Sequence, residues 1–179
     1  DSSGSWDLVV ENTATNVESS AFRGAFPATV LQGDAVQSPI PTAAAACFFT
    51  DPPYYDAVPY ADLSDFFFVW LKRALPGHAL LRDAEDLANR LTPKVREIVQ
   101  DETKQFEGQP KDRAFFEGQM GKAFAEGRRV LRENGVGCVV FAHKTTEGWE
   151  ALLSGMIRGG WVVVGSWPVL TERSARMRA

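Results

Sequence analysis

The sequence predicts an α/β fold in which a mostly parallel sheet is flanked by helices. Short apolar runs typical of strands alternate along the chain with amphipathic stretches typical of helices. The runs at 46–51, 137–143 and 161–170 are nearly continuous in apolar residues, as expected for strands that are covered on both faces. Alternation of strands with helices favours parallel pairing through crossover connections.

Two further runs, 6–11 and 28–34, are also predicted to be strands because they are rich in β-branched and apolar residues. The first predicted helix is 62–75, with Asp62 or Ser64 as its N-cap and basic residues in its last turn. Its apolar stripe is expected to pack in the core.

Three more helices are predicted from caps and periodicity. Thr92 and Pro93 are typical of an N-cap and a first helical position, so a helix is expected from there. The helix at 112–133 should end before Gly135, and the helix at 147–158 should end at Gly159-Gly160. We interpret 1–179 as a single partial domain, in which 76–111 is an insertion with one or two short helices and a polar loop.

The composition is that of a folded protein. The chain has 179 residues, of which 45% are hydrophobic and 23% charged, so disorder is not expected. It has no apolar run long enough to cross a membrane and no secretion signal, so a cytoplasmic location is expected. Cys47 and Cys138 lie in apolar runs and are predicted to be buried free thiols, without the neighbours of a zinc site.

The formal net charge of -4 differs from the basic surface typical of a nucleic-acid-binding protein. Only the end of the sequence is basic, through Arg173, Arg176 and Arg178, which could form a phosphate-contacting strip or a solvated tail. The first residue is Asp rather than Met, and we expect the chain to be a piece of a longer protein or a processed product.

A short motif directly follows the predicted strand at 46–51. Asp51, Pro52, Pro53 and Tyr54 stand where ligands bind in open parallel sheets, beyond the carboxyl end of a strand. The two prolines fix φ and remove two N–H donors, so the backbone leaves the sheet as a rigid arm. A carboxylate and a proline carbonyl can accept the two hydrogens of an amino group while an aromatic ring stacks on the planar group that bears it. The motif therefore predicts a site for a planar amine.

This motif resembles the Asp-Pro-Pro-Tyr signature of amino-group methyltransferases that use S-adenosyl-L-methionine. Its wider context also resembles one group, the large adenine-specific DNA methylases that carry a zinc ribbon elsewhere in the chain. The resemblance covers roughly residues 28–179, and it rests on the segments TDPPYYDAVPYADLSDFFFVWLKRAL, LTPK, FEGQMGKAFAEGRRVLRENG, VVFAHKTTEGWEALL and GWVVVGSWPVLTER.

The resemblance implies a partial class I, Rossmann-like methyltransferase fold and N6-adenine methylation of DNA. Asp51 and the carbonyl of Pro52 would accept hydrogen bonds from the target amine, Pro53 would shape the turn, and Tyr54 would stack on the flipped base. The residues implied to contact the cofactor are Asp34, Ala35 and Asp51. The residues that would line the substrate site are Tyr55, Tyr60, His143 and Lys144. A restriction-modification setting is typical of such enzymes.

The chain departs from the family pattern in the cofactor half of the site. The Phe-x-Gly-x-Gly turn of the methyltransferase fold is not found, and FRGAF at 22–26 is a poor match. The zinc ribbon is also absent. We therefore expect the chain to be a C-terminal catalytic fragment that carries the target-amine half, with the remainder of the parent chain supplying most of the cofactor half.

Two alternatives stay open. The first is a methyltransferase for another amine, in N4-cytosine, an RNA base or a protein glutamine; an acid at Asp51 favours adenine but does not separate DNA from RNA. The second is a non-catalytic module, like a methyltransferase in fold, that binds nucleic acid or a protein partner. Steep loss of binding with salt, without methyl transfer, would favour the second.

Overall fold

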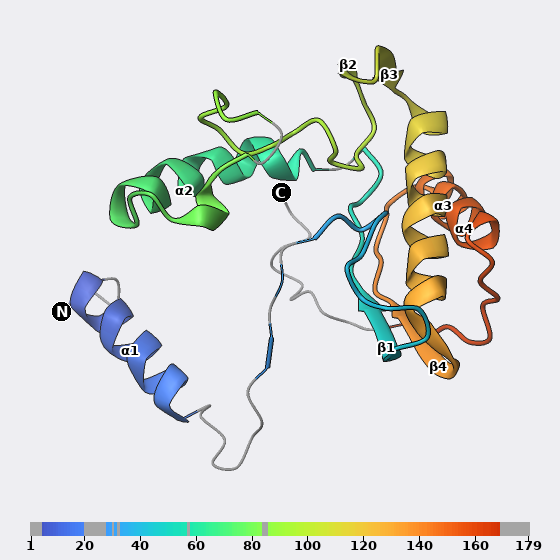
Figure 1. Cartoon of the computed structure of the whole chain (residues 1–179), viewed down its shortest axis with the longest axis horizontal. Coiled ribbons are helices and arrows are strands. Elements are labelled where there is room, and N and C mark those ends of the chain that lie inside the picture. Colours follow the sequence, from blue (N-terminus) through green and yellow to red (C-terminus); the bar gives the residue numbers. More distant parts are fainter. Residues whose placement is uncertain are drawn as a thin grey trace. The chain divides into compact units, whose positions relative to one another are not determined.

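The computed structural model describes residues 5–19, 28–29, 31, 33–56, 58–83 and 86–168. The chain divides into two compact units, Asp1–Gln32 and Gly33–Ala179. The fold is α/β, with a small parallel sheet and helices (Figure 1). None of the helices in the described ranges combines the length and the apolar character needed to cross a membrane.

The first unit contains helix α1 (Trp6–Ser19), so the strand predicted at 6–11 was wrong. Ser5 precedes the helix, and its Oγ accepts a hydrogen bond from the N–H of Leu8 at 3.3 Å, as an N-cap does. Asp7 adds a favourable negative charge in the first turn. A helix completes most of its backbone hydrogen bonds within itself, whereas a strand needs a partner, so the local cap outweighs the β-branched composition here.

The parallel strands β1 (Ala45–Thr50) and β4 (Leu131–Val139) form the sheet of the second unit. Phe49 is opposite Cys138, and the N–H of Val140 donates to the carbonyl of Thr50 at 2.8 Å. Both strands therefore finish together at one edge. The strand predicted at 46–51 is confirmed, whereas β4 begins and ends earlier than the predicted 137–143.

Two other predicted strands are wrong in the residues that the structure describes. Residues 28, 29, 31 and 33 have no regular structure, and Asp34 makes only an isolated bridge with Gln37; residues 30 and 32 lie outside the described residues. Residues 161–168 are also irregular, and 169–170 are not described. Trp161 instead packs against the core, where its indole N–H donates to the carbonyl of Phe124 at 2.7 Å.

Helices α3 (Arg113–Val130) and α4 (Thr146–Arg158) confirm the two helices predicted from periodicity. They pack on each other on one side of the sheet (Figure 1). The core consists of Tyr55, Phe116, Met120, Phe124, Ala151 and Leu152. The ring of Phe48 in β1 packs against Gly127, where an added Cβ would lie 2.6 Å from the ring, so this glycine lets α3 approach the sheet closely.

The end of α3 differs from the prediction, but the end of α4 does not. β4 follows α3 without a loop and runs through Gly135, so this glycine is not the helix stop. Gly159 and Gly160 do end α4, as predicted, and Gly160 adopts a φ of 80° that favours glycine.

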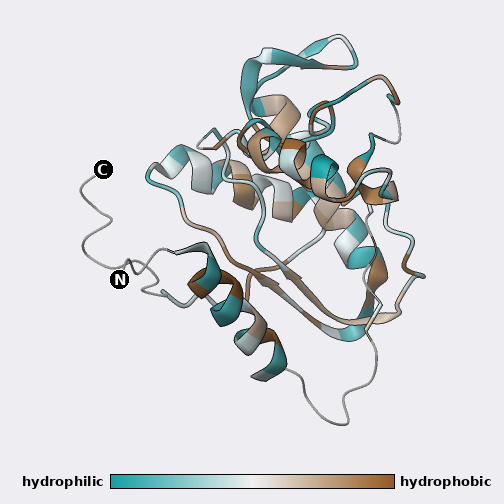
Figure 2. Cartoon of the chain, turned by 90° about the vertical axis from the view of Figure 1, so that its left-hand side faces the viewer, coloured by the Kyte–Doolittle hydropathy of each residue, from teal (hydrophilic) through white to brown (hydrophobic). Residues whose placement is uncertain are grey.

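Helix α2 (Tyr60–Ala74) confirms the helix predicted at 62–75 but begins two residues earlier. Asp62 and Ser64 lie within it and are not its N-cap, which is Pro59. The chain then passes through a 3-10 turn, η1 (Ala79–Leu81), and a hairpin of β2 (Asp101–Phe106) and β3 (Gln109–Lys111). Figure 2 shows that the hairpin is mostly hydrophilic.

The helix predicted from Thr92-Pro93 is absent in this part of the structure, which is irregular. The N–H of Thr92 donates to Asp65 in α2 at 2.8 Å, so this residue caps no helix of its own. The structured residues of 76–111 are one short helical turn, within the one or two short helices predicted, and a hairpin that was not predicted.

The sheet is covered on one face only within the described residues. Cys47 and Cys138 are free but exposed, so their predicted burial was wrong. Phe49 and Val136 share this face and are 68% and 66% exposed. The stripe on α2 is likewise open, since Phe66 and Phe67 are about two-thirds exposed rather than packed in the core.

Candidate functional site

The candidate site lies where β1 and β4 end side by side. The segment Asp51 to Asp56 leaves β1, and the segment from Phe141 to Glu147 leads from β4 into α4. Because parallel strands present their carboxyl ends at the same sheet edge, the two segments meet there. The motif predicted to hold an amine is thus at the expected edge of a parallel sheet.

Each residue of the motif has a distinct environment. Asp51 is exposed, Pro52 is buried, and Pro53 and Tyr54 are half-buried. The carbonyl of Pro53 accepts a hydrogen bond from the N–H of Tyr55 at 3.2 Å, which closes a tight turn. The motif therefore presents the carboxylate of Asp51 to solvent on a backbone that the prolines restrict.

The ring of Tyr54 belongs to an aromatic wall formed with the segment after β4. Its edge meets Phe141 at a centroid distance of 5.2 Å. Phe141 in turn meets Trp149 at 5.0 Å, edge to face, and stacks on His143 with ring planes 9° apart. These contacts hold the ring of Tyr54, three residues after Asp51, against the segment that follows β4.

Tyr55 is buried, and its contacts fix the turn that follows the motif. It is 3% exposed, and its ring packs edge to face on Phe116 and His143. Its hydroxyl donates to Glu147 at 3.3 Å. Burial, together with the charge of Glu147, raises the pKa of Tyr55 to about 12. The backbone φ of 34° is uncommon for a residue with a side chain, so the turn after the motif is strained.

His143 holds the other side of this turn. Its Nε2 lies 3.3 Å from a carboxylate oxygen of Asp56, and its side chain is 6% exposed. The Nδ1 accepts a hydrogen bond from the N–H of Thr145 at 3.2 Å, so in the neutral ring the proton is on Nε2, facing Asp56. Gly148 makes room for the ring, because an added Cβ there would lie 2.3 Å from Nδ1.

The remaining predicted site residues have other surroundings. Tyr60 begins α2 and is 38% exposed, and Lys144 is exposed next to His143. Ala35 is an exposed turn residue. Asp34 accepts from the N–H of Val36 at 2.9 Å and forms an ion pair with Arg96 at 2.8 Å.

The contacts of Asp34 bear on the expected cofactor. Both of its carboxylate oxygens already have partners, so this side chain does not present an unengaged carboxylate to a cofactor. It is nevertheless linked to the motif through one segment: Arg96 binds Asp34, and the N–H of Gln100 donates to the carbonyl of Tyr55 at 3.0 Å.

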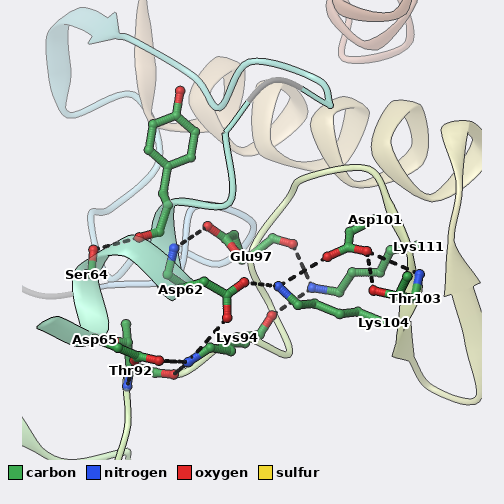
Figure 3. Close-up of polar contacts among 12 residues, drawn as sticks. Asp62, Ser64, Asp65, Thr92, Lys94, Glu97, Asp101, Thr103, Lys104 and Lys111 are labelled. Atoms are coloured by element: carbon green, nitrogen blue, oxygen red, sulfur yellow. Dashed lines mark hydrogen bonds and ion pairs between the residues drawn. The ribbon is translucent and has the colours of Figure 1, made fainter.

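A polar network fixes α2 against the hairpin (Figure 3). Lys94 pairs with Asp65 at 2.8 Å, and Lys104 pairs with Asp62 in the first turn of α2. The carboxylate of Glu97 accepts from the N–H of Ala61 at 2.8 Å, which satisfies a donor at the start of the helix. The network thereby fixes the first turns of α2, which follow the motif closely in the sequence.

Lys111 lies inside the same network. It is 1% exposed, and its ammonium donates to the carbonyls of Lys94 at 2.7 Å and Glu97 at 2.9 Å. Burial lowers the pKa of this side chain. The hydrogen bond from Lys94 lowers the pKa of Asp65, which keeps that carboxylate charged in the pair.

Several contributors were not found from the sequence. Phe141, Glu147, Gly148 and Trp149 complete the surroundings of the motif, but they are far from it in the sequence. Only their position directly after β4 was a usable signal, because neighbouring parallel strands end together.

Comparison of the chain with protein-family models, curated proteins and solved structures finds no match. Functional inference therefore depends on the motif and its surroundings.

Proposed function

We propose that the chain carries the amine-binding half of an S-adenosyl-L-methionine-dependent N6-adenine DNA methyltransferase with a Rossmann-like fold. The observation that carries this proposal is the place of the motif: Asp51-Pro52-Pro53-Tyr54 follows a parallel strand directly, at the carboxyl edge of the sheet, with Asp51 exposed and Tyr54 in an aromatic wall. Ligands of open α/β sheets bind at that edge.

Each residue of the motif would make a different contact with a flipped adenine. The carboxylate of Asp51 and the carbonyl of Pro52 would accept the two N–H bonds of the amino group, which orients the nitrogen lone pair away from them. Tyr54 would stack on the base, and the contact with Phe141 would hold the Tyr54 ring in position. Positioning of this kind is a major source of rate enhancement in transfer reactions.

The cofactor would supply an electrophilic methyl group, and we propose that the remainder of a longer parent chain provides most of its binding site. The engaged carboxylate of Asp34 and the missing glycine-rich turn both support this division. The proton released from the amine would pass to solvent through the exposed side of Asp51.

Labelled methyl transfer tests the proposal. The parent chain should transfer label from the cofactor to duplex DNA, and Asp51→Ala should reduce the rate about 10²–10³-fold, as removal of a key polar group beside the reacting atoms does in other enzymes. Glu133→Ala removes an exposed carboxylate of β4 and serves as the matched control. An equal reduction in both variants, or none in either, would contradict a role for Asp51.

A second candidate function is a non-catalytic module that binds a protein partner or nucleic acid. The exposed apolar face of the sheet, with Phe49 and Val136, and the open stripe of α2 favour it. A folded, cofactor-bound parent chain that binds its partner but methylates neither DNA, RNA nor protein would select this candidate.

A further inference from the structure

The loop after α2 forms a cavity of about 500 Å³ that is rich in cationic side chains. Its polar lining residues are Lys72, His78, Arg82, Asp83, Asn89 and Arg90. The chain doubles back along α2 here (Figure 1), and the ammonium of Lys72 donates to the carbonyl of Arg90 at 2.9 Å, which closes the loop against the helix. The cavity lies outside the candidate active site.

The charge balance in this cavity favours an anion. Among the described lining residues, three permanent cations stand beside one acid, in a chain whose net charge is -4. That acid, Asp83, is engaged locally, since it accepts from the side chain of Asn89 at 2.9 Å and from the N–H of Asp86 at 3.2 Å. The carboxyl end of α2 contributes roughly half a negative charge, which is smaller than the cationic excess.

Among the described residues, the cationic side chains have more N–H bonds than the hydrogen bonds they donate. An ammonium has three N–H bonds and a guanidinium five. Lys72 uses one for the carbonyl of Arg90, and Arg82 uses one for the carbonyl of Gly77 at 3.2 Å. The Nδ1 of His78 accepts from the N–H of Leu80, so its Nε2 carries the proton of the neutral ring and is a further donor.

The rest of the lining is apolar, through Leu75, Leu81 and Leu87. Cationic side chains can pair with phosphates, and the leucines beside them can contact the carbons of the sugars between those phosphates. We propose that this cavity binds the backbone of a nucleic-acid strand. The proposal rests on the proposed function in one respect, which is that the strand is the DNA whose base enters the site at Asp51.

Helix α2 separates the cavity from Tyr60, which begins the helix. Lys72 follows Tyr60 by twelve residues of α2, which corresponds to about 18 Å along the helix axis. One DNA strand advances about 3.4 Å per nucleotide, so a strand that follows α2 from Tyr60 to the cavity would place several phosphates between them.

Binding of fluorescent duplex DNA by the 179-residue chain, measured over a range of salt concentrations, tests the proposal without requiring methyl transfer. The variant K72Q/R82Q/R90Q should bind more weakly and lower the salt slope by about 0.9 for each phosphate that the protein no longer neutralises. The control K122Q/R128Q/R132Q removes the same charge from exposed positions of α3 and β4 and should leave the slope almost unchanged. Equal effects in both variants, or no salt-dependent binding by the wild type, would overturn the proposal.

A chemical scan of the DNA keeps the protein unchanged and so avoids any failure to fold. Neutral methylphosphonates scanned along the strand should weaken binding at a limited set of positions several nucleotides from the target base, and the same groups elsewhere should not. A uniform effect along the strand would overturn the proposal, as would full competition by inorganic phosphate, which would identify a free anion as the ligand. In the cofactor-bound parent chain, DNA binding through the cavity without methylation would contradict the proposed function alone. Methylation that the triple variant leaves unchanged would contradict only this inference.

Discussion

The imidazole Nε2 of His143 lies 3.3 Å from the carboxylate of Asp56, so the segment after β4 holds the turn that follows Asp51-Pro52-Pro53-Tyr54. The same ring packs against Tyr55 in that turn and stacks on Phe141, which supports Tyr54. His143 thus reaches the motif through three neighbours and is a positioning residue for it.

Replacing His143 by Ala should lower the free energy of unfolding by about 1–3 kcal/mol, because the buried ring and its interaction with Asp56 are removed together. Urea unfolding followed by tryptophan fluorescence measures this change. Lys122→Ala is the control, since Lys122 is exposed on α3. Unfolding midpoints that match for the two variants would refute the anchoring role of His143.

Gly148→Ala should destabilise the protein by about 1–3 kcal/mol, because its Cβ would lie 2.3 Å from the His143 ring. Gly118→Ala in α3 is the matched control: its Cβ would meet no atom within 4 Å, so a gain of about 0.5–1 kcal/mol in helix stability is expected. In a double-mutant cycle, His143→Ala should remove most of the cost of Gly148→Ala. Additive effects would show that the two residues do not share this space.

Tyr55→Phe should change how stability depends on alkaline pH. The folded-state pKa of Tyr55 is about 12, above the ordinary value of 10.0, so the folded chain keeps its proton where the unfolded chain loses it. The contribution of the neutral hydroxyl is complete below about pH 10 and is lost as the pH rises towards about 12. The wild type should therefore lose stability relative to Tyr55→Phe over this window, and parallel pH curves would contradict the burial of this hydroxyl.

Asp65→Asn should flatten the acid limb of the stability curve. The pKa of Asp65 is lowered, chiefly by the hydrogen bond from Lys94, so its contribution is present above pH 3.8 and is lost as the pH falls through the folded-state pKa. Thermal unfolding at a series of acidic pH values measures this. Glu102→Gln, at an exposed position of β2, should leave the curve unchanged; a similar flattening there would assign the effect to net charge instead.

The sequence predicted the elements whose signals are local or periodic. The apolar run of β1, the apolar faces of α3 and α4, and the glycines that end α4 were all predicted correctly, because side-chain periodicity and caps act over a few residues. The composition of 6–11 was misleading, since a single N-cap at Ser5 outweighs it.

Contacts between distant segments could not be predicted in the same way. Lys94 and Asp65 are 29 residues apart, and Tyr55 and Glu147 are 92 apart, so only the fold brings them together. The motif was located at the correct sheet edge because that edge follows from parallel pairing. Its aromatic wall was missed because Phe141 and Trp149 stand in the sequence only as apolar residues of a strand and a helix.

The measurement that tests the central claim most directly is nucleoside mass spectrometry of duplex DNA after incubation with the parent chain and S-adenosyl-L-methionine. We expect N6-methyladenine with the wild type and with Glu133→Ala, and none with an equally folded Asp51→Ala variant. A folded, cofactor-bound wild type that leaves adenine unmodified, or an Asp51→Ala variant that methylates as well as the wild type, would contradict the claim.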